Sequence, residues 1–118
     1  MNEATISTHV LDTASGRPAA GVGVELAVRG DGPDGERWSV FGAARTDTDG
    51  RCAAFPVLPP AVTHVRLRFD VGPYQSPRSS GGTAFFPEVT VAFAVSPGEH
   101  HHVPLLLSPF GYSVYRGS

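Results

Sequence analysis

The sequence predicts an all-β protein, a two-sheet β-sandwich of seven to eight strands with at most one short helix. Apolar and polar residues alternate with a period of two in short runs along the whole chain, the pattern of half-buried strands. Glycine and proline number 14 and 11 in 118 residues, and they separate these runs, which disfavours long helices. Because short amphipathic strands need an opposed apolar layer, the pattern favours a sandwich.

In the first half of the chain, four strands are expected. The first is rich in β-branched residues and places His9 and Leu11 on one face. The Asp-Thr-Asp-Gly segment at 47–50 is typical of a hairpin turn. The expected order is a strand at 5–13, a turn at 15–18, a strand at 22–29, a polar loop at 31–35, a strand at 38–46, the turn at 47–50 and a short strand at 51–55.

In the second half, four more strands are expected. The prolines between 55 and 63 make that segment poor as a helix, although a single helical turn after Pro60 is compatible with them. Valine, leucine and phenylalanine then alternate cleanly with polar residues over 64–71. The expected order after this strand is a loop at 72–84, a strand at 88–95, a turn at 96–99, and strands at 100–107 and 111–116.

Length and composition narrow the class of protein. The chain fits a single domain over residues 1–118. Its net charge is −2, and all nine basic residues are scattered arginines, so neither nucleic acid nor a membrane surface is an expected partner. No apolar run is long enough to span a bilayer, and the first residues lack the features of a secretory signal. We therefore expect a cytoplasmic protein.

The run His100-His101-His102 is the first candidate for chemistry. On a strand, His100 and His102 share one face, and His101 points to the other. Two imidazoles on one face suit proton transfer or metal binding, or they are simply solvated at the start of a strand. No Cys-x-x-Cys or His-Glu-x-x-His pattern supplies further zinc ligands. Residue types alone leave these three alternatives open.

Other polar residues have simpler interpretations. His9 lies in the middle of a strand, where a hydrogen-bonded core or interface histidine is expected, and Arg51 starts a short strand as a solvated arginine. Cys52, the only cysteine, is expected to be a small buried side chain rather than an activated thiolate. Asp47 and Asp49 are expected to form a turn, because the remaining ligands of a calcium loop are missing.

The last eleven residues carry three aromatic side chains and an arginine, which is unusual for a segment that normally frays. One interpretation is a final strand docked by its aromatic residues. The other is that Tyr115, Arg116 and Ser118 reach a binding site.

Four stretches of the chain together resemble the transthyretin-like family. The terminal Tyr-Arg-Gly-Ser is similar to the signature that separates the family's 5-hydroxyisourate hydrolases from the hormone carrier transthyretin. The middle residue of the histidine run departs from the family pattern, in which tyrosine is usual, and we expect little effect because it points to the other face. The matching stretches are residues 7–12 with 16–19, 46–51, 85–88, and 102–109 with 115–118.

The resemblance implies a transthyretin-like sandwich that hydrolyses 5-hydroxyisourate to 2-oxo-4-hydroxy-4-carboxy-5-ureidoimidazoline in urate catabolism. It also implies a homotetramer, with sites at the dimer–dimer interface and with neither a metal nor an organic cofactor. The resemblance also implies a short helix over residues 55–63, but this stretch is rich in proline, which leaves the presence of the helix open. The alternative function is a non-catalytic transthyretin-like protein that binds a small ligand.

Residue by residue, the resemblance also implies a site. His9 and His102 would position and deprotonate water, and Arg51 would hold the substrate and the developing oxyanion. Ser118 would orient substrate or water, through either its hydroxyl or a terminal carboxylate. The expected catalytic residues are His9, Arg51, His102 and Ser118, and the expected substrate-binding residues are Tyr115 and Arg116.

Overall fold

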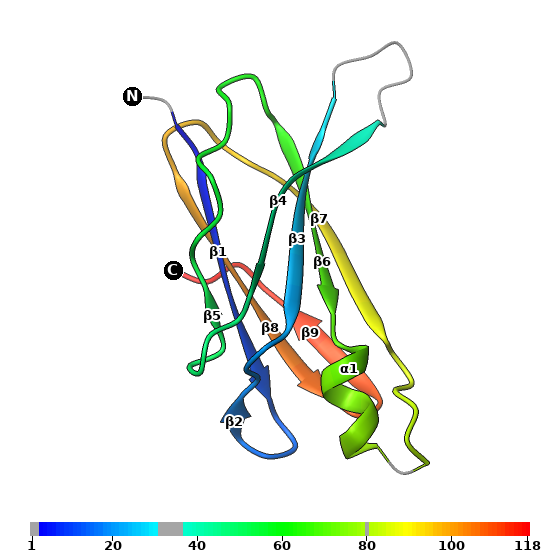
Figure 1. The fold of residues 1–118 in the computed structure, drawn as a ribbon. Coiled ribbons are helices and arrows are strands. Elements are labelled where there is room, and N and C mark those ends of the chain that lie inside the picture. The colour runs from blue at the N-terminus through cyan, green and yellow to red at the C-terminus, as the bar shows by residue number, and fades with distance from the viewer. Residues whose placement is uncertain (1–2, 31–36, 80) are drawn as a thin grey trace.

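The protein folds into two β-sheets packed face to face, as predicted (Figure 1). The computed structural model describes residues 3–30, 37–79 and 81–118, so the loop expected at 31–35 lies outside the described residues. One sheet has the order β2-β1-β8-β9, with β5 also paired to β1, and the other has the order β4-β3-β6-β7. The strands are β1 (Thr5–Asp12), β2 (Arg17–Pro18), β3 (Gly23–Arg29), β4 (Trp38–Arg45), β5 (Arg51–Cys52), β6 (His64–Asp70), β7 (Glu88–Ala94), β8 (His100–Ser108) and β9 (Gly111–Val114).

The core lies between the two sheets and is built from the inward residue of each alternating pair. In β6, Val65, Leu67 and Phe69 are fully buried, as the alternation predicted, and Leu26 of β3 and Leu105 of β8 are equally buried. Burying each of these side chains contributes about 1.5–3 kcal/mol. The core therefore fixes which face of every strand points outward.

The pairing of β1 with β8 positions the candidate site. The two strands run parallel in one register from Thr5 opposite His100 to Asp12 opposite Leu107. On the other side of β1, β5 pairs antiparallel and sets His9 opposite Arg51. The outward side chains of three chain segments are thereby gathered on one sheet face.

The turn at 47–50 forms as predicted and fixes the start of β5. The Asp47 carboxylate accepts hydrogen bonds from the backbone N–H groups of Asp49 (2.9 Å) and Arg51 (3.0 Å). Gly50 has φ of +74°, and a Cβ there would lie 2.5 Å from the Val10 carbonyl oxygen. Glycine is therefore required where this turn approaches β1.

The loop expected over 72–84 begins instead with helix α1 (Gly72–Gln75), followed by a 3₁₀ turn (Ser76–Arg78). Proline in the first turn suits a helix start, because its missing N–H is not needed there. Tertiary contacts then hold this short helix: the Tyr74 hydroxyl donates to the Asp12 carboxylate (2.8 Å), and the Gln75 amide donates to the Ser108 carbonyl (3.0 Å). The helix lies after β6, whereas residues 55–63 contain none.

Two predicted strands were too long by more than one residue. β5 ends at Cys52 rather than at residue 55, because the following residues turn inward to bury Phe55 and Leu58, and the Leu58 N–H bonds to the Ala4 carbonyl (3.0 Å). β9 ends at Val114 rather than at residue 116. The two-residue β2 lies where only a turn was expected, and it brings the number of strands in the described residues to nine.

Within residues 3–30, 37–79 and 81–118, no helix is long and apolar enough to cross a membrane.

Candidate active site

Most of the predicted site residues meet on the outer face of the five-stranded sheet. Arg51, His102 and Ser118 line one open pocket of about 270 Å³. His9 lies beside them, because its backbone pairs with that of Arg51 in the ladder. In Figure 1 the end of the chain lies beside β1 and β5, in agreement with this grouping. The pocket is completed by Ser7, Thr8, Ala53 and His100.

Within the part of the chain that the structure describes, the His102 ring is hydrogen-bonded at one of its two nitrogens. Its Nδ1 atom lies 2.8 Å from the Ser7 hydroxyl oxygen. Nε2 is therefore the ring nitrogen that can exchange a proton with a molecule in the pocket.

The surroundings of His102 favour its neutral form. Burial lowers the pKa of the His102 imidazole below its ordinary value of 6.5, and the nearby charges of His9, His100 and Arg51 lower it further. A neutral imidazole has a lone pair at neutral pH, which a general base requires. The pocket therefore contains a histidine prepared to accept a proton.

The chain end is docked as a strand-like segment and also reaches the pocket. The Gly117 N–H donates to the His102 carbonyl at 2.7 Å, and these two residues form an isolated β-bridge. A Cβ at Gly117 would lie 2.8 Å from the His102 ring carbon Cδ2 and 3.3 Å from Cγ of Pro104. Glycine thus allows the tail to lie against the ring and brings Ser118 to the pocket.

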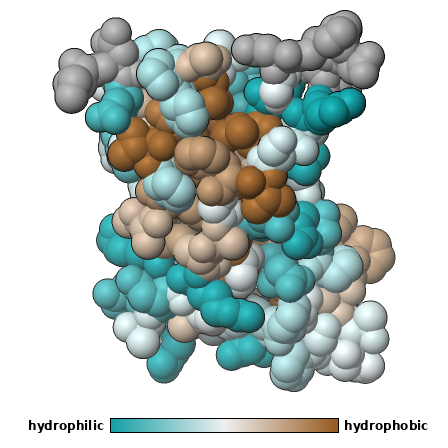
Figure 2. Space-filling model, turned by 45° about the horizontal axis from the view of Figure 1, so that its top comes forward, coloured by the Kyte–Doolittle hydropathy of each residue, from teal (hydrophilic) through white to brown (hydrophobic). Residues whose placement is uncertain are grey.

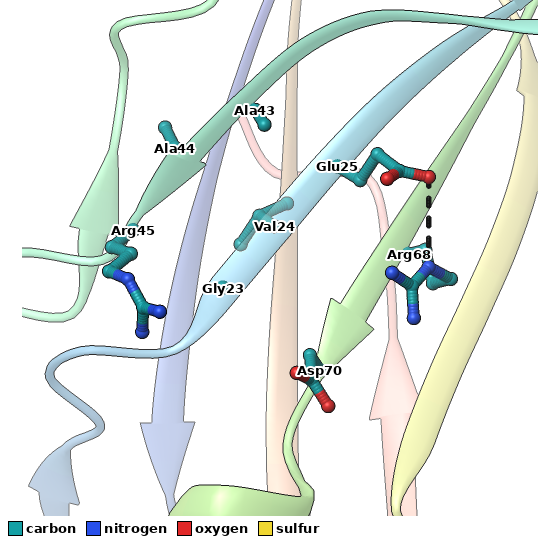
Figure 3. A pocket seen from close by; sticks show the side chains of 8 residues that line it. All are labelled: Gly23, Val24, Glu25, Ala43, Ala44, Arg45, Arg68 and Asp70. Atoms are coloured by element: carbon teal, nitrogen blue, oxygen red, sulfur yellow. Dashed lines mark ion pairs between the residues drawn. The ribbon is translucent and has the colours of Figure 1, made fainter.

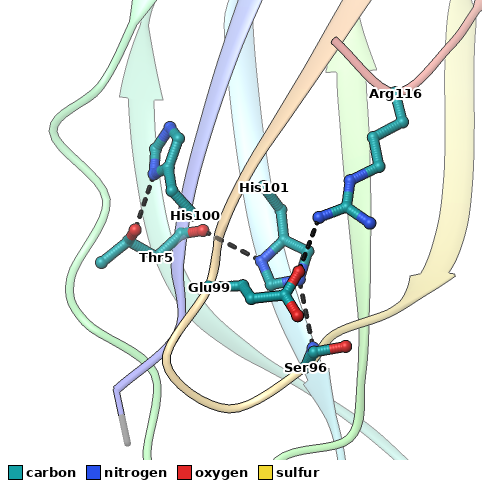
Figure 4. Close-up of polar contacts among 6 residues, drawn as sticks. All are labelled: Thr5, Ser96, Glu99, His100, His101 and Arg116. Atoms are coloured by element: carbon teal, nitrogen blue, oxygen red, sulfur yellow. Dashed lines mark hydrogen bonds and ion pairs between the residues drawn. The ribbon is translucent and has the colours of Figure 1, made fainter. Parts of the chain in front are cut away.

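In the single chain, Tyr115 and Arg116 do not line the pocket that contains His102. Both line a separate, mainly apolar depression of about 250 Å³ between the edges of β7 and β9. The Arg116 guanidinium donates to the Glu99 carboxylate at 2.9 Å (Figure 4). Their role as substrate-binding residues therefore stays a prediction.

His101 points away from the pocket, as expected. It is 3 % exposed, its Nε2 accepts the Ser96 N–H (3.1 Å), and its Nδ1 lies 3.3 Å from the Thr5 carbonyl oxygen (Figure 4). These partners satisfy the ring with Nδ1 as donor and Nε2 as acceptor. His101 is thus a structural side chain of the sandwich interior.

Sequence reasoning missed the hydroxyl groups that contact the histidines. Ser7 is 8 % exposed, and its hydroxyl lies 2.8 Å from Nε2 of His100 as well as 2.8 Å from Nδ1 of His102. Thr5 contacts Nδ1 of His100 at 2.6 Å. The period of two along β1, which places Thr5, Ser7 and His9 on one face, was the available signal.

The structure also shows the surroundings of the other residues considered as candidates from the sequence. Nε2 of His9 is hydrogen-bonded to the Asp49 carbonyl at 2.8 Å, so His9 is partnered at one nitrogen. Cys52 is buried, and burial raises the pKa of its thiol, in agreement with a small core side chain. Among the residues that the structure describes, no group of three or more His, Cys, Asp or Glu side chains is arranged to hold a metal ion.

A different depression, of about 360 Å³, lies on the four-stranded sheet (Figure 3). Its Arg68 side chain pairs with Glu25 at 3.7 Å and with Glu88 at 3.1 Å. The charge of Arg68 is therefore paired with carboxylates of the same exposed surface. The pocket at His102 is the better candidate, because it combines a base of lowered pKa with a cation.

The fold and the site define a transthyretin-like β-sandwich with a histidine and arginine pocket on its outer face. The model of the HIUase/Transthyretin family matches residues 6–117, and the chain belongs to this family. A relative from Caulobacter vibrioides, named 5-hydroxyisourate hydrolase, is 45% identical over 118 residues, which cover 96% of this chain and 97% of the relative.

Solved structures agree with this assignment. The structure of Klebsiella pneumoniae 5-hydroxyisourate hydrolase matches with a TM-score of 0.78 and 31% identity, covering 98% of this chain and 99% of that one. The structure of transthyretin from Sparus aurata matches with a TM-score of 0.82 and 26% identity, covering 96% of each chain. The fold is therefore shared by both branches of the family.

We predict that Gly117→Ala will displace the tail from His102. The added methyl group would overlap the ring, and the tail is the less firmly held partner, so we expect a stability loss of only about 1 kcal/mol. Nuclear magnetic resonance (NMR) should show a changed environment of the His102 ring protons and faster amide exchange at position 117. Gly111→Ala is the control, since its Cβ would have an ordinary contact of 3.5 Å. An unchanged His102 spectrum in Gly117→Ala would contradict the contact.

Proposed function

We propose that this chain hydrolyses 5-hydroxyisourate, opening its ring to 2-oxo-4-hydroxy-4-carboxy-5-ureidoimidazoline in urate degradation. The observation that carries the proposal is the His102 imidazole, kept neutral beside the Arg51 cation in one pocket. Relatives that match nearly the whole chain are named for this activity. The family includes transthyretin, so the pocket chemistry and not the fold supports catalysis.

The histidines would activate water. His102, through Nε2, would accept a proton as water attacks a ring carbonyl carbon, and His9 would help to position that water. The carbon–nitrogen bond of the ring then breaks, and the proton held by the imidazolium passes to the departing nitrogen. Base and acid are thus the same group at successive steps.

Arg51 would stabilise the negative charge that develops on the carbonyl oxygen. Its guanidinium offers several donors in a fixed plane, which suits an oxyanion or a polar heterocycle. The Asp47–Gly50 turn holds the Arg51 backbone next to His9, and the Arg51 side chain lines the pocket with His102. Ser118, which lines the same pocket, would orient substrate or water.

The alternative is a sandwich that binds a small ligand without converting it. The match to a transthyretin structure supports this reading of the fold. It does not account for the His9, Arg51 and His102 grouping, and the two functions are separated by the assay below.

We further propose that four copies assemble, with the pockets at the dimer–dimer interface, in the cytoplasm. The described surface carries large exposed apolar side chains, among them Phe110 (79 % exposed) and Phe85 (65 %). In addition to these side chains, Figure 2 shows a hydrophobic patch in the upper half of the view, bordered by hydrophilic residues. Such surface is typical of interfaces between subunits. The single buried cysteine is compatible with a reducing compartment.

The activity is tested with freshly prepared 5-hydroxyisourate, whose ultraviolet absorbance is followed with and without protein. We expect rapid loss with the native chain and a decrease of about 10²–10⁴-fold in kcat for His102→Gln, because the general base is removed. His64→Gln is the matched control, since His64 lies on the other sheet beside Arg29. Spontaneous decay unchanged by the native protein would exclude catalysis and favour the binding alternative.

The pH dependence is a separate prediction. Because the pKa of His102 is lowered below 6.5, kcat/KM should stay high at neutral pH and fall only when the pH drops below that value. Removing the Arg51 charge removes one cause of the lowering, so the pKa of His102 should rise and the acid limb of the residual activity of Arg51→Gln should lie at a higher pH than in the native chain. Arg66→Gln, on the other sheet, should leave the limb in place. An acid limb at the same pH in all three would contradict the role of Arg51.

The oligomer is tested by sedimentation equilibrium and light scattering. We expect a mass of about four chains, and the pair Phe85→Ser with Phe110→Ser should lower it by removing exposed apolar area. Ser39→Ala, an exposed substitution on β4, is the control. A native protein that remains a single chain at micromolar concentration would refute the assembly.

A further inference from the structure

Four side chains from β1 and β8 form a continuous hydrogen-bonded row along the outer face of the sheet. Thr5 Oγ1 lies 2.6 Å from Nδ1 of His100, Nε2 of His100 lies 2.8 Å from Ser7 Oγ, and Ser7 Oγ lies 2.8 Å from Nδ1 of His102. Figure 4 shows the Thr5 end of this row. The row exists because the parallel register sets Thr5 opposite His100 and Ser7 opposite His102.

The chemistry of a hydroxyl group restricts how protons can be arranged in this row. Ser7 has one O–H, so it donates to one imidazole and accepts from the other. If Nδ1 of His102 carries a proton, it donates to Ser7, and Ser7 donates to Nε2 of His100. If Ser7 donates to His102, then Nε2–H of His100 donates to Ser7. The tautomers of the two histidines are therefore linked through Ser7.

Only the first arrangement leaves Nε2 of His102 with a lone pair. That nitrogen is the one that the proposed hydrolysis uses as a base. In the same arrangement Nδ1–H of His100 donates to the Thr5 hydroxyl, so both nitrogens of His100 and Nδ1 of His102 have partners while Nε2 of His102 faces the pocket. Ser7, which is almost fully buried, is well placed to maintain it.

We propose that Ser7 and His100 act as a relay that sets the tautomer of His102 and receives the positive charge when His102 accepts a proton. This inference rests on the proposed hydrolysis and assigns Ser7 and His100 as positioning residues for it. Neither group need contact the substrate, because both act through the Nδ1 side of His102.

The proton transfers balance without any further reactant. Nε2 of His102 gains a proton from water, and the imidazolium passes its Nδ1 proton to Ser7 Oγ while the Ser7 hydroxyl proton moves to Nε2 of His100. His102 is neutral again with its proton on Nε2, Ser7 is unchanged, and His100 carries the charge. In the single chain His100 is exposed and His102 is partly buried, so a charged imidazole is better hydrated at His100. Return of the proton along the row restores the first arrangement.

The charged and titratable groups around the row are few. His9 and Arg51 face His102 from β1 and β5, and both disfavour a charge on it. Glu99 precedes His100 in the chain, but its carboxylate pairs with Arg116 (Figure 4). Among the described residues, the side-chain hydrogen bonds that join His100 to His102 run through Ser7, while Ser118 lines the same pocket.

The first test does not depend on activity. Nitrogen-15 NMR of the imidazoles, followed across pH, reports the tautomer and titration of each histidine in native protein, Ser7→Ala and Ser7→Thr. We expect a His102 ring protonated at Nδ1 in the native chain, a changed tautomer population in Ser7→Ala, and recovery in Ser7→Thr, which keeps the hydroxyl. Identical His102 tautomer and titration in native protein and Ser7→Ala would overturn the relay.

The second test uses turnover. We expect kcat to fall about 10–100-fold in Ser7→Ala and in His100→Gln, with KM changed less than threefold, because the substrate-binding groups remain. Ser39→Ala is the control, because it removes a serine hydroxyl from the other sheet, away from the pocket. If the native chain does not turn over 5-hydroxyisourate but the NMR coupling is present, the proposed function fails and the relay stands. Full kcat in Ser7→Ala would overturn the relay while leaving the hydrolysis intact.

Discussion

The parallel pairing of β1 with β8 is the constraint on which the rest of this protein depends. It joins residues about 95 positions apart, and its register decides at once which side chains enter the core and which meet on the surface. Inward, it sets Ile6 and Val10 among the buried residues. Outward, it sets Ser7 beside His102. A slip of one residue would exchange these two sets, which the apolar core forbids.

The histidine run shows how one strand serves two environments. His101 is enclosed and satisfied by backbone groups, whereas His100 and His102 contact hydroxyl groups beside an arginine. The same residue type is structural on one face and suited to proton transfer on the other, because the two faces differ in burial and in neighbouring charge. Position on the strand, not residue type, separates these roles.

The pocket combines positive charge with partial burial. Arg51 and the histidines oppose protonation of His102, and burial opposes it most. That arrangement costs some stability at low pH, where the unfolded chain binds a proton that the folded chain resists, and the loss grows as the pH falls below 6.5. Functional sites commonly carry such unfavourable electrostatics, because the reaction requires the unprotonated group.

The sequence by itself determined most of the strands and their faces, the Asp47–Gly50 turn and the opposite directions of His101 and His102, since these follow from a local period of two and from local turn chemistry. The resemblance in its motifs extended this to the family and to most of the pocket. Helix α1 was not predicted, because glycine and proline at its start are typical of a loop. Its stability comes from contacts with Asp12 and Ser108, which are distant in the chain. Only the tertiary structure decided that Ser7 lies between two histidines and that Arg116 pairs with Glu99. Such contacts depend on strand pairing and register, which are set by burial of the whole core and by no local segment.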